Sequence, residues 1–112
     1  MKKIEAIIRH SKVAEVHEAL EKVGHPGMMI TELEGHGTQN GVEQTVRGKV
    51  YKIGLMNKAR LEIVVKDTDV KKTVSAIREA ALTGKVGDGK IFIYPVENAI
   101  RIRTNEEGDI AL

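Results

Sequence analysis

Residues 59–96 read ARLEIVVKDTDVKKTVSAIREAALTGKVGDGKIFIYPV, and this stretch decides the fold. Residues 59–65 alternate between apolar and polar side chains, which is typical of a half-buried strand. Apolar residues then recur at helical spacing up to Gly84, which can end a helix. Residues 91–96 are strand-like again, so the stretch predicts a strand, a helix and a second strand. The apolar stripe of the predicted helix is Val70, Val74, Ile77 and Ala81.

The first part of the chain repeats this order of elements. Residues 2–9 and 28–34 favour strands, and a helix is expected between them, with Gly24 at its end. Ser11 and Thr68 are the predicted N-caps of the two helices. The order predicts a single domain over residues 1–112, with an α+β, ferredoxin-like βαββαβ fold: a four-stranded antiparallel sheet with two helices on one face. The face of the sheet without helices stays bare and carries apolar residues, so we expect the chain to oligomerise and cover it.

The composition excludes several classes of protein. Of 112 residues, 41% are hydrophobic and 30% are charged, and the net charge is +2, as in an ordinary globular domain. No apolar run approaches the roughly 20 residues of a membrane span. The chain has no cysteine, which excludes disulfides and thiolate metal sites and fits a cytoplasmic location. Three aromatic residues are too few for base stacking, so no nucleic-acid partner is expected.

Glycines cluster in two places. Of 11 glycines, five lie between positions 35 and 54 and three between 84 and 89. The first cluster indicates either a long loop, functional or disordered, or a protruding hairpin that extends the flanking strands. The second lies in TGKVGDGK, residues 83–90, where Gly87 and Gly89 permit positive φ angles. Backbone N–H groups in such a turn can hold a phosphate, with Lys90 as a cation; an ordinary helix–strand connection is the alternative.

Two other groups of residues are candidates for ligand binding. Arg101 and Arg103 would point the same way on a short strand at residues 100–103, which suits a polyphosphate or merely a solvated face. Residues 105–112 are predicted to be an acidic, mobile tail. Gln39, in a glycine-rich run, could offer a carbonyl oxygen to a metal, or only solvate a flexible hairpin. No nucleophile lies at a readable spacing from a base, so catalysis is not expected.

The run Thr83–Phe92, together with Ala99–Thr104 and the opening MKKIEAII, resembles the PII nitrogen-regulatory signal proteins over essentially the whole chain. The resemblance implies a homotrimer that binds ATP or ADP in clefts between subunits. It further implies 2-oxoglutarate and Mg²⁺ beside ATP, at the base of a long T-loop, here about residues 37–55. The phosphate loop is then about residues 83–90, and residues 101–112 form the C-terminal segment.

The resemblance also assigns roles to single residues. The nucleotide would be bound by Gly35, Gly37, Thr38, Glu62, Val64, Gly87, Asp88, Gly89 and Lys90, with Arg101 and Arg103 from the neighbouring subunit. Gln39 would bind Mg²⁺, and Gln39, Lys58 and the backbone near Gly41 would hold 2-oxoglutarate. In the T-loop, Arg47 matches a residue that plugs an ammonium transporter, and Tyr51 matches a uridylylation site of some members.

The chain departs from the family pattern in the T-loop and before it. Thr38 replaces an arginine, His36 an aromatic residue and Met29 a threonine. The resemblance as a whole favours a cytoplasmic regulator of nitrogen metabolism that reaches the membrane through a transporter, or acts on an enzyme of nitrogen assimilation. The departures keep other roles open. The alternatives are a nucleotide sensor that controls inorganic-carbon uptake, metal export or nitrogenase, and a weak ATPase.

Overall fold

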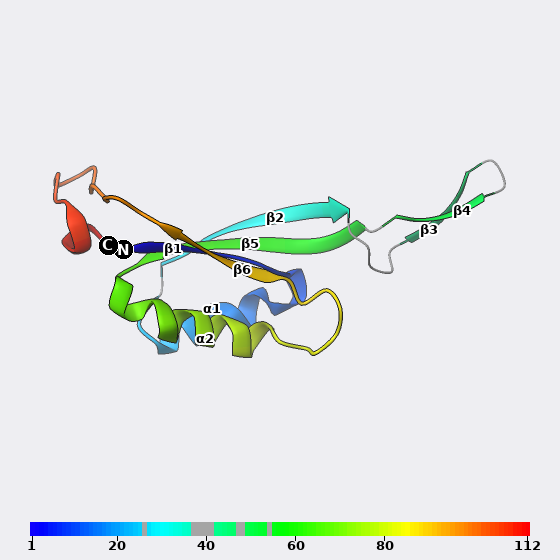
Figure 1. Cartoon of the computed structure of the whole chain (residues 1–112), viewed down its shortest axis with the longest axis horizontal. Coiled ribbons are helices and arrows are strands. Elements are labelled where there is room, and N and C mark those ends of the chain that lie inside the picture. The colour runs from blue at the N-terminus through cyan, green and yellow to red at the C-terminus, as the bar shows by residue number, and fades with distance from the viewer. Residues whose placement is uncertain (26, 37–41, 47–48, 54) are drawn as a thin grey trace.

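The computed structural model of this chain describes residues 1–25, 27–36, 42–46, 49–53 and 55–112. Its main sheet has four antiparallel strands in the order β2-β5-β1-β6. Two helices cover one face of this sheet (Figure 1). The predicted ferredoxin-like fold is thereby confirmed. The elements are β1 (Lys2–Arg9), α1 (Val13–Lys22), β2 (Met29–His36), β5 (Leu55–Val65), α2 (Val70–Ala81) and β6 (Lys90–Pro95).

The core lies between the sheet and the two helices. Alternate side chains of β1 and β5 point toward the helices, because successive residues of a strand face opposite sides. Val16 and Leu20 of α1 and Ile77 of α2 meet them and are fully buried. Burial of each such side chain contributes about 1.5–3 kcal/mol to the free energy of unfolding. The strand residues of this core are Ile4, Ala6, Ile8, Ala59, Leu61, Ile63 and Val65.

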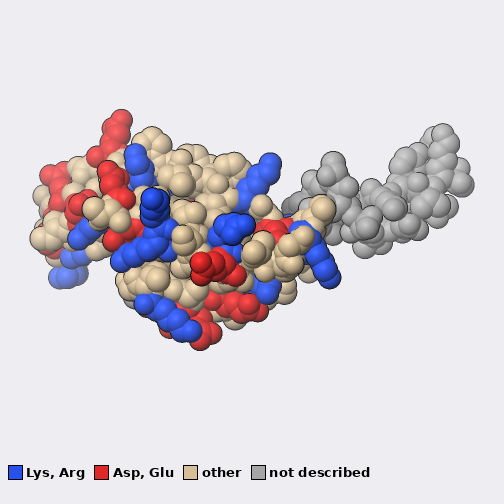
Figure 2. All heavy atoms as spheres, turned by 60° about the horizontal axis from the view of Figure 1, so that its bottom comes forward, with Lys and Arg blue, Asp and Glu red and all other residues tan. Residues whose placement is uncertain are grey.

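On the opposite side of the sheet, called the open face here, the described part of the chain places neither α1 nor α2 (Figure 1). This face mixes charged and apolar side chains, as the alternation predicts. Figure 2 shows the side of the molecule that carries the helices, where acidic and basic side chains are intermixed. The open face is lined by Lys3, Glu5, Ile7 and Arg9 of β1, Lys58, Arg60, Glu62 and Val64 of β5, and Lys90, Phe92 and Tyr94 of β6.

Both helices begin later than their predicted N-caps. Ser11 lies inside a 3₁₀ turn, η1 (His10–Lys12), and Thr68 lies inside another, η2 (Asp67–Asp69). The N-caps are Lys12 and Asp69, and neither makes a side-chain capping hydrogen bond. The predicted caps are therefore wrong. The 3₁₀ turns satisfy the free backbone groups that a capping side chain would otherwise bind.

The segment between β2 and β5 contains a hairpin, β3 (Val42–Val46) paired with β4 (Lys49–Ile53). The β2–β5 pairing itself continues out to His36 and Leu55. In the described residues, β2 and β5 run further than predicted, and the hairpin of β3 and β4 forms a separate two-stranded sheet (Figure 1). The hairpin begins beyond the end of the sheet at which β2 ends and β5 starts.

The chain beyond β6 also differs from its prediction. Only Ile100 makes a strand-like bridge, to Glu107, so the strand expected at residues 100–103 is wrong. Asn105 has a φ of +60°, which reverses the chain after the alternating residues. The predicted mobile tail instead ends in a 3₁₀ turn, η3 (Gly108–Ala111). None of the helices in the described ranges is long and apolar enough to cross a membrane.

Candidate ligand-binding site

The loop of residues 83–90 is organised by the carboxylate of Asp88. Its Oδ2 accepts hydrogen bonds from the backbone N–H groups of Thr83 and Gly84, both at 2.9 Å. Its Oδ1 accepts from the Thr83 hydroxyl and from Nε of Arg9, the latter at 3.3 Å. The hydrogen bonds from Thr83 hold the pKa of Asp88 well below its usual range. Asp88 therefore braces the loop as an anion.

Two glycines determine the backbone conformation of this loop. Gly87 and Gly89 have φ angles of +111° and +99°, as the sequence predicted. At Gly89 an added Cβ would lie 1.7 Å from the carbonyl oxygen of Ile7, so only glycine fits against β1. The loop thus passes directly over a strand of the sheet and delivers Lys90 to the first position of β6.

Two cations lie beneath the loop. Arg9 donates through Nη2 to the carbonyl oxygen of Val86 at 2.8 Å, and the buried Lys58 donates through Nζ to the carbonyl oxygen of Gly87. Arg9 and Lys58 are cross-strand partners on β1 and β5. Arg9 binds the carboxylate of Asp88, and the charge of this carboxylate also acts on Lys58 at longer range. Burial lowers the pKa of Lys58, and the neighbouring Arg9 lowers it further. This corner of the molecule therefore favours an anion.

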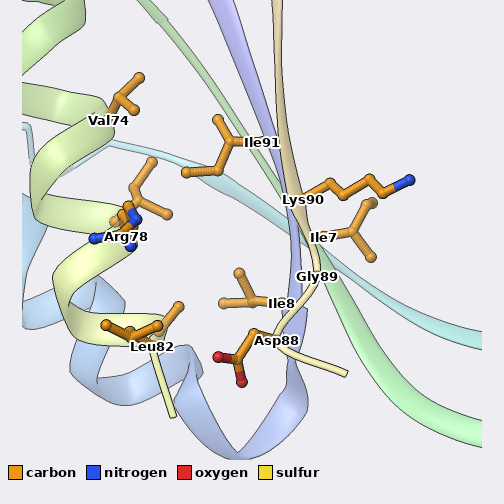
Figure 3. A pocket seen from close by; sticks show the side chains of 11 residues that line it. Ile7, Ile8, Val74, Arg78, Leu82, Asp88, Gly89, Lys90 and Ile91 are labelled. Atoms are coloured by element: carbon orange, nitrogen blue, oxygen red, sulfur yellow. The ribbon is translucent and has the colours of Figure 1, made fainter. Parts of the chain in front are cut away.

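Lys90 and Asp88 project to opposite sides of the sheet. Figure 3 shows the Asp88 carboxylate on the side of α2, while Lys90 and Ile7 point away from it. A cavity of about 440 Å³ opens between α2 and β6, and it is lined mainly by apolar side chains such as Val74, Leu82 and Ile91. Lys90 is exposed on the open face, where it has no ion-pair partner among the described residues. Lys90 is thus available to a ligand.

A second hollow lies on the open face near β2. It has a volume of about 300 Å³, and its lining includes Met28, Met29, Glu62 and Val64. The Glu62 carboxylate lies 3.6 Å from Nζ of Lys3 and 3.1 Å from Nε of Arg60. Apolar walls with one oriented carboxylate suit a flat ring that carries hydrogen-bond donors.

The two C-terminal arginines lie far from the loop of residues 83–90 in the same chain. The loop precedes β6 and the arginines follow it, so they lie beyond opposite ends of that strand (Figure 1). Arg101 forms an ion pair with Glu106 at 3.0 Å, whereas Arg103 is exposed and unpaired within the described ranges. One chain therefore does not unite these cations with the loop.

The remaining predicted residues divide between described and undescribed positions. Gly35 lies in β2, opposite Met56, and Tyr51 lies in β4, opposite Gln44. Sequence reasoning missed Arg9 and Thr83, which carry the contacts of Asp88. The signal for Arg9 was its place in the alternation of β1, on the same face as Ile7. The residues that lie outside the described ones are Gly37, Thr38, Gln39, Gly41 and Arg47.

Comparison with known proteins identifies relatives across the whole length. The family model for the nitrogen regulatory protein P-II matches residues 1–106. The chain is 50% identical over 112 residues to the nitrogen regulatory protein P-II of Pasteurella multocida, and each chain is covered completely. It is 49% identical over 112 residues to the nitrogen regulatory protein P-II 2 of Methanothermobacter thermautotrophicus. This match covers 100% of the present chain and 97% of the relative.

A solved structure matches the fold as well. The crystal structure of Arabidopsis thaliana PII bound to citrate superposes with a TM-score of 0.81 at 37% identity. The match covers 99% of this chain and 91% of the Arabidopsis chain. The similarity therefore includes the sheet, both helices and the segment that follows β6.

Proposed function

This chain belongs to the nitrogen regulatory protein P-II family, whose members are regulatory signal proteins, and from this premise we propose that it is a homotrimeric sensor of ATP and ADP. The nucleotide would bind in the clefts between subunits. Mg²⁺ and 2-oxoglutarate would join ATP there, and the T-loop would carry the signal to a partner protein. The regulated process would be nitrogen metabolism.

The observation that carries this proposal is the separation of two anion-binding groups within one chain. The loop of residues 83–90 offers Lys90 at one end of β6, and Arg101 and Arg103 follow its other end. A triphosphate needs several cations at once, because its charge is concentrated on neighbouring oxygens. A second copy of the chain could bring its arginines to the first copy's loop, and the resulting cleft would then be complete.

The proposed nucleotide would lie along the open face. Its base would occupy the hollow near β2, against Val64 and Glu62. Its phosphates would reach the turn at Gly87 and Gly89, where positive φ angles can leave backbone N–H groups free for an anion. Asp88 would act by bracing this turn, since its oxygens already accept hydrogen bonds from Thr83, Gly84 and Arg9.

The proposed effector would bind next to the phosphates. Lys58 lies beneath the loop with Arg9, and a dicarboxylate such as 2-oxoglutarate would be attracted by the two positive charges. Gln39 would coordinate Mg²⁺, and Gly41 would offer its backbone to the effector. These two residues belong to the T-loop. A ligand that contacts them in only one loop conformation shifts the population toward that conformation.

The proposed partner would read the T-loop. Arg47 would enter an ammonium transporter or another target, and Tyr51 is the proposed site of uridylylation. Capture from a native lysate, with and without ATP plus 2-oxoglutarate, tests this step. A transporter, or an enzyme of nitrogen assimilation, should be retained in a ligand-dependent way. Retention of a target from another process would contradict the nitrogen assignment.

Calorimetric titration with ATP and with ADP tests the binding step. We expect saturable binding of both nucleotides by the wild-type protein. Lys90→Ala should weaken ATP binding by about tenfold or more, because a charge-assisted hydrogen bond is lost. Lys71→Ala, which removes an exposed cation on α2, is the matched control and should bind like the wild type. Absence of binding by the wild type would overturn the proposal.

A further inference from the structure

The chain after β6 closes on itself to form a compact unit, residues 98–112, called the C-terminal turn here. The backbone N–H of Arg101 donates to the carbonyl oxygen of Glu106 at 2.9 Å, and that of Asn105 donates to the carbonyl oxygen of Arg101 at 2.8 Å. The N–H of Gly108 donates to the carbonyl oxygen of Ala99 at 3.0 Å. These bonds hold the turn together without help from the sheet.

The side chain of Arg101 links the two halves of this turn by hydrogen bonds. Its Nη1 binds Oε1 of Glu106 at 3.0 Å, and its Nη2 donates to the carbonyl oxygen of Ile110 at 3.1 Å. Arg101 thereby connects the first half of the turn to η3. Arg103, two residues further along, makes no ion pair among the described residues. The two arginines are therefore in different states before any ligand arrives.

We propose that Glu106 competes with the nucleotide phosphates for Arg101, and so sets the affinity of the nucleotide site to which this arginine contributes. The inference rests on the proposed function. Carboxylate and phosphate oxygens bind the same guanidinium edge with similar geometry. A phosphate that takes the N–H groups by which Arg101 binds Glu106 and the carbonyl oxygen of Ile110 must displace both of these acceptors. Part of the free energy of the phosphate interaction then offsets the cost of opening the C-terminal turn, so the observed affinity is lower.

The competition also couples the ligand to the end of the chain. When Arg101 moves to a phosphate, the hydrogen bond to Ile110 is lost, and η3 is then held to the first half of the turn only through Gly108, whose N–H donates to Ala99 and Asn98. Bound and free protein then differ in the order of residues 109–112. Such a difference is a population shift that a ligand produces through its differential contacts with two states. Arg103 serves the phosphate in both states.

Calorimetric titration of ATP into Glu106→Gln tests the competition. Glutamine keeps the size of the side chain and removes its charge, so Arg101 is held less strongly. Both groups are about one-third exposed, at 38% and 35%, so a modest ion-pair contribution is expected. We expect ATP affinity to rise about 2- to 5-fold. Asp109→Asn is the matched control: it removes the same charge from the same segment, at a carboxylate without an ion pair among the described residues, and should change affinity little.

A double-mutant cycle separates the specific contact from general electrostatics. In an Arg101→Ala background, Glu106→Gln should leave ATP affinity unchanged, because the competing pair no longer exists.

Hydrogen exchange adds a second readout, since ATP should speed exchange of the Leu112 amide, which is bonded to the carbonyl oxygen of Asp109. Wild type that binds ATP while Glu106→Gln binds equally or more weakly would overturn only this inference. Wild type that binds no ATP would overturn the proposed function and this inference with it.

Discussion

At the scale of single residues, two glycines with similar backbone conformations face different surroundings. Gly84 has a φ of +82° and open space where a Cβ would stand. Gly89 has a φ of +99°, but its Cβ would collide with the carbonyl oxygen of Ile7. The two positions therefore separate the conformational cost of a side chain from the cost of a clash.

We expect Gly84→Ala to lower the free energy of unfolding by about 1–2 kcal/mol, the cost of a left-handed L-residue. Gly89→Ala should cost more and should also displace the loop of residues 83–90, because β1 blocks the added methyl group. Urea denaturation measures both costs at one fixed protein concentration. Equal costs for the two variants would contradict the contact between Gly89 and Ile7.

The depressed pKa of Asp88 makes a prediction about acid stability. An unfolded aspartate has a pKa of about 3.9, and that of folded Asp88 is lower because Thr83 donates hydrogen bonds to it. The folded state therefore holds fewer protons, and Asp88 contributes stability that is present above about pH 4 and lost as pH falls below it. Asp88→Asn should be less stable than the wild type at pH 7, and the gap should narrow below pH 4. Thermal unfolding across this range measures the gap. A gap of constant size from pH 7 to pH 2 would contradict the account.

At the scale of secondary-structure elements, hydrophobic periodicity predicted more than side-chain signals did. The stripes at Val16, Leu20 and Ile77 placed both helices against the sheet, because burial of an apolar face dominates helix stability in a domain. The predicted caps were wrong because a 3₁₀ turn precedes each helix. Thr73 carries a different local contact, as its hydroxyl donates to the carbonyl oxygen of Asp69 at 2.7 Å.

In the candidate site too, some features could be predicted from the sequence and others depend on the folded structure. The positive φ angles of Gly87 and Gly89 were predicted from residue type, since glycine alone adopts them at little cost. The contact between Arg9 and Asp88 joins residues 79 positions apart, and only the folded sheet brings them together. The strand predicted around Arg101 was wrong because alternation also fits a chain that reverses at Asn105.

Packing of α2 on the sheet allows a direct test at this scale. Ile77 is fully buried among core residues of β1 and β5, so Ile77→Ala should lower the free energy of unfolding by about 2–5 kcal/mol. Ser75, on the exposed side of the same helix, provides the control, and Ser75→Ala should change it by less than about 0.5 kcal/mol. Similar losses for both variants would mean that this face of α2 does not form the core.

At the scale of the whole molecule, exposed apolar side chains indicate where further copies of the chain would pack. Ile102 is fully exposed, and Phe92 and Tyr94 on the open face are each more than 40% exposed. Isolated apolar residues are common at surfaces, but these lie on the open face and in the C-terminal turn, the two parts that the proposed cleft joins. We expect the proposed trimer, at three times the chain mass of 12.3 kDa, to bury them.

The most direct test of the shared cleft is complementation between two defective chains. Chains carrying Lys90→Ala and chains carrying Arg103→Ala are mixed in equal amounts, unfolded, refolded together and titrated with ATP, with native mass spectrometry to verify mixed trimers. Each variant alone should bind weakly. In the mixture, about a quarter of the clefts combine an intact Lys90 with an intact Arg103 from the neighbour, and these should bind with wild-type affinity. Mixed trimers without any such high-affinity clefts would contradict a nucleotide site built from two subunits.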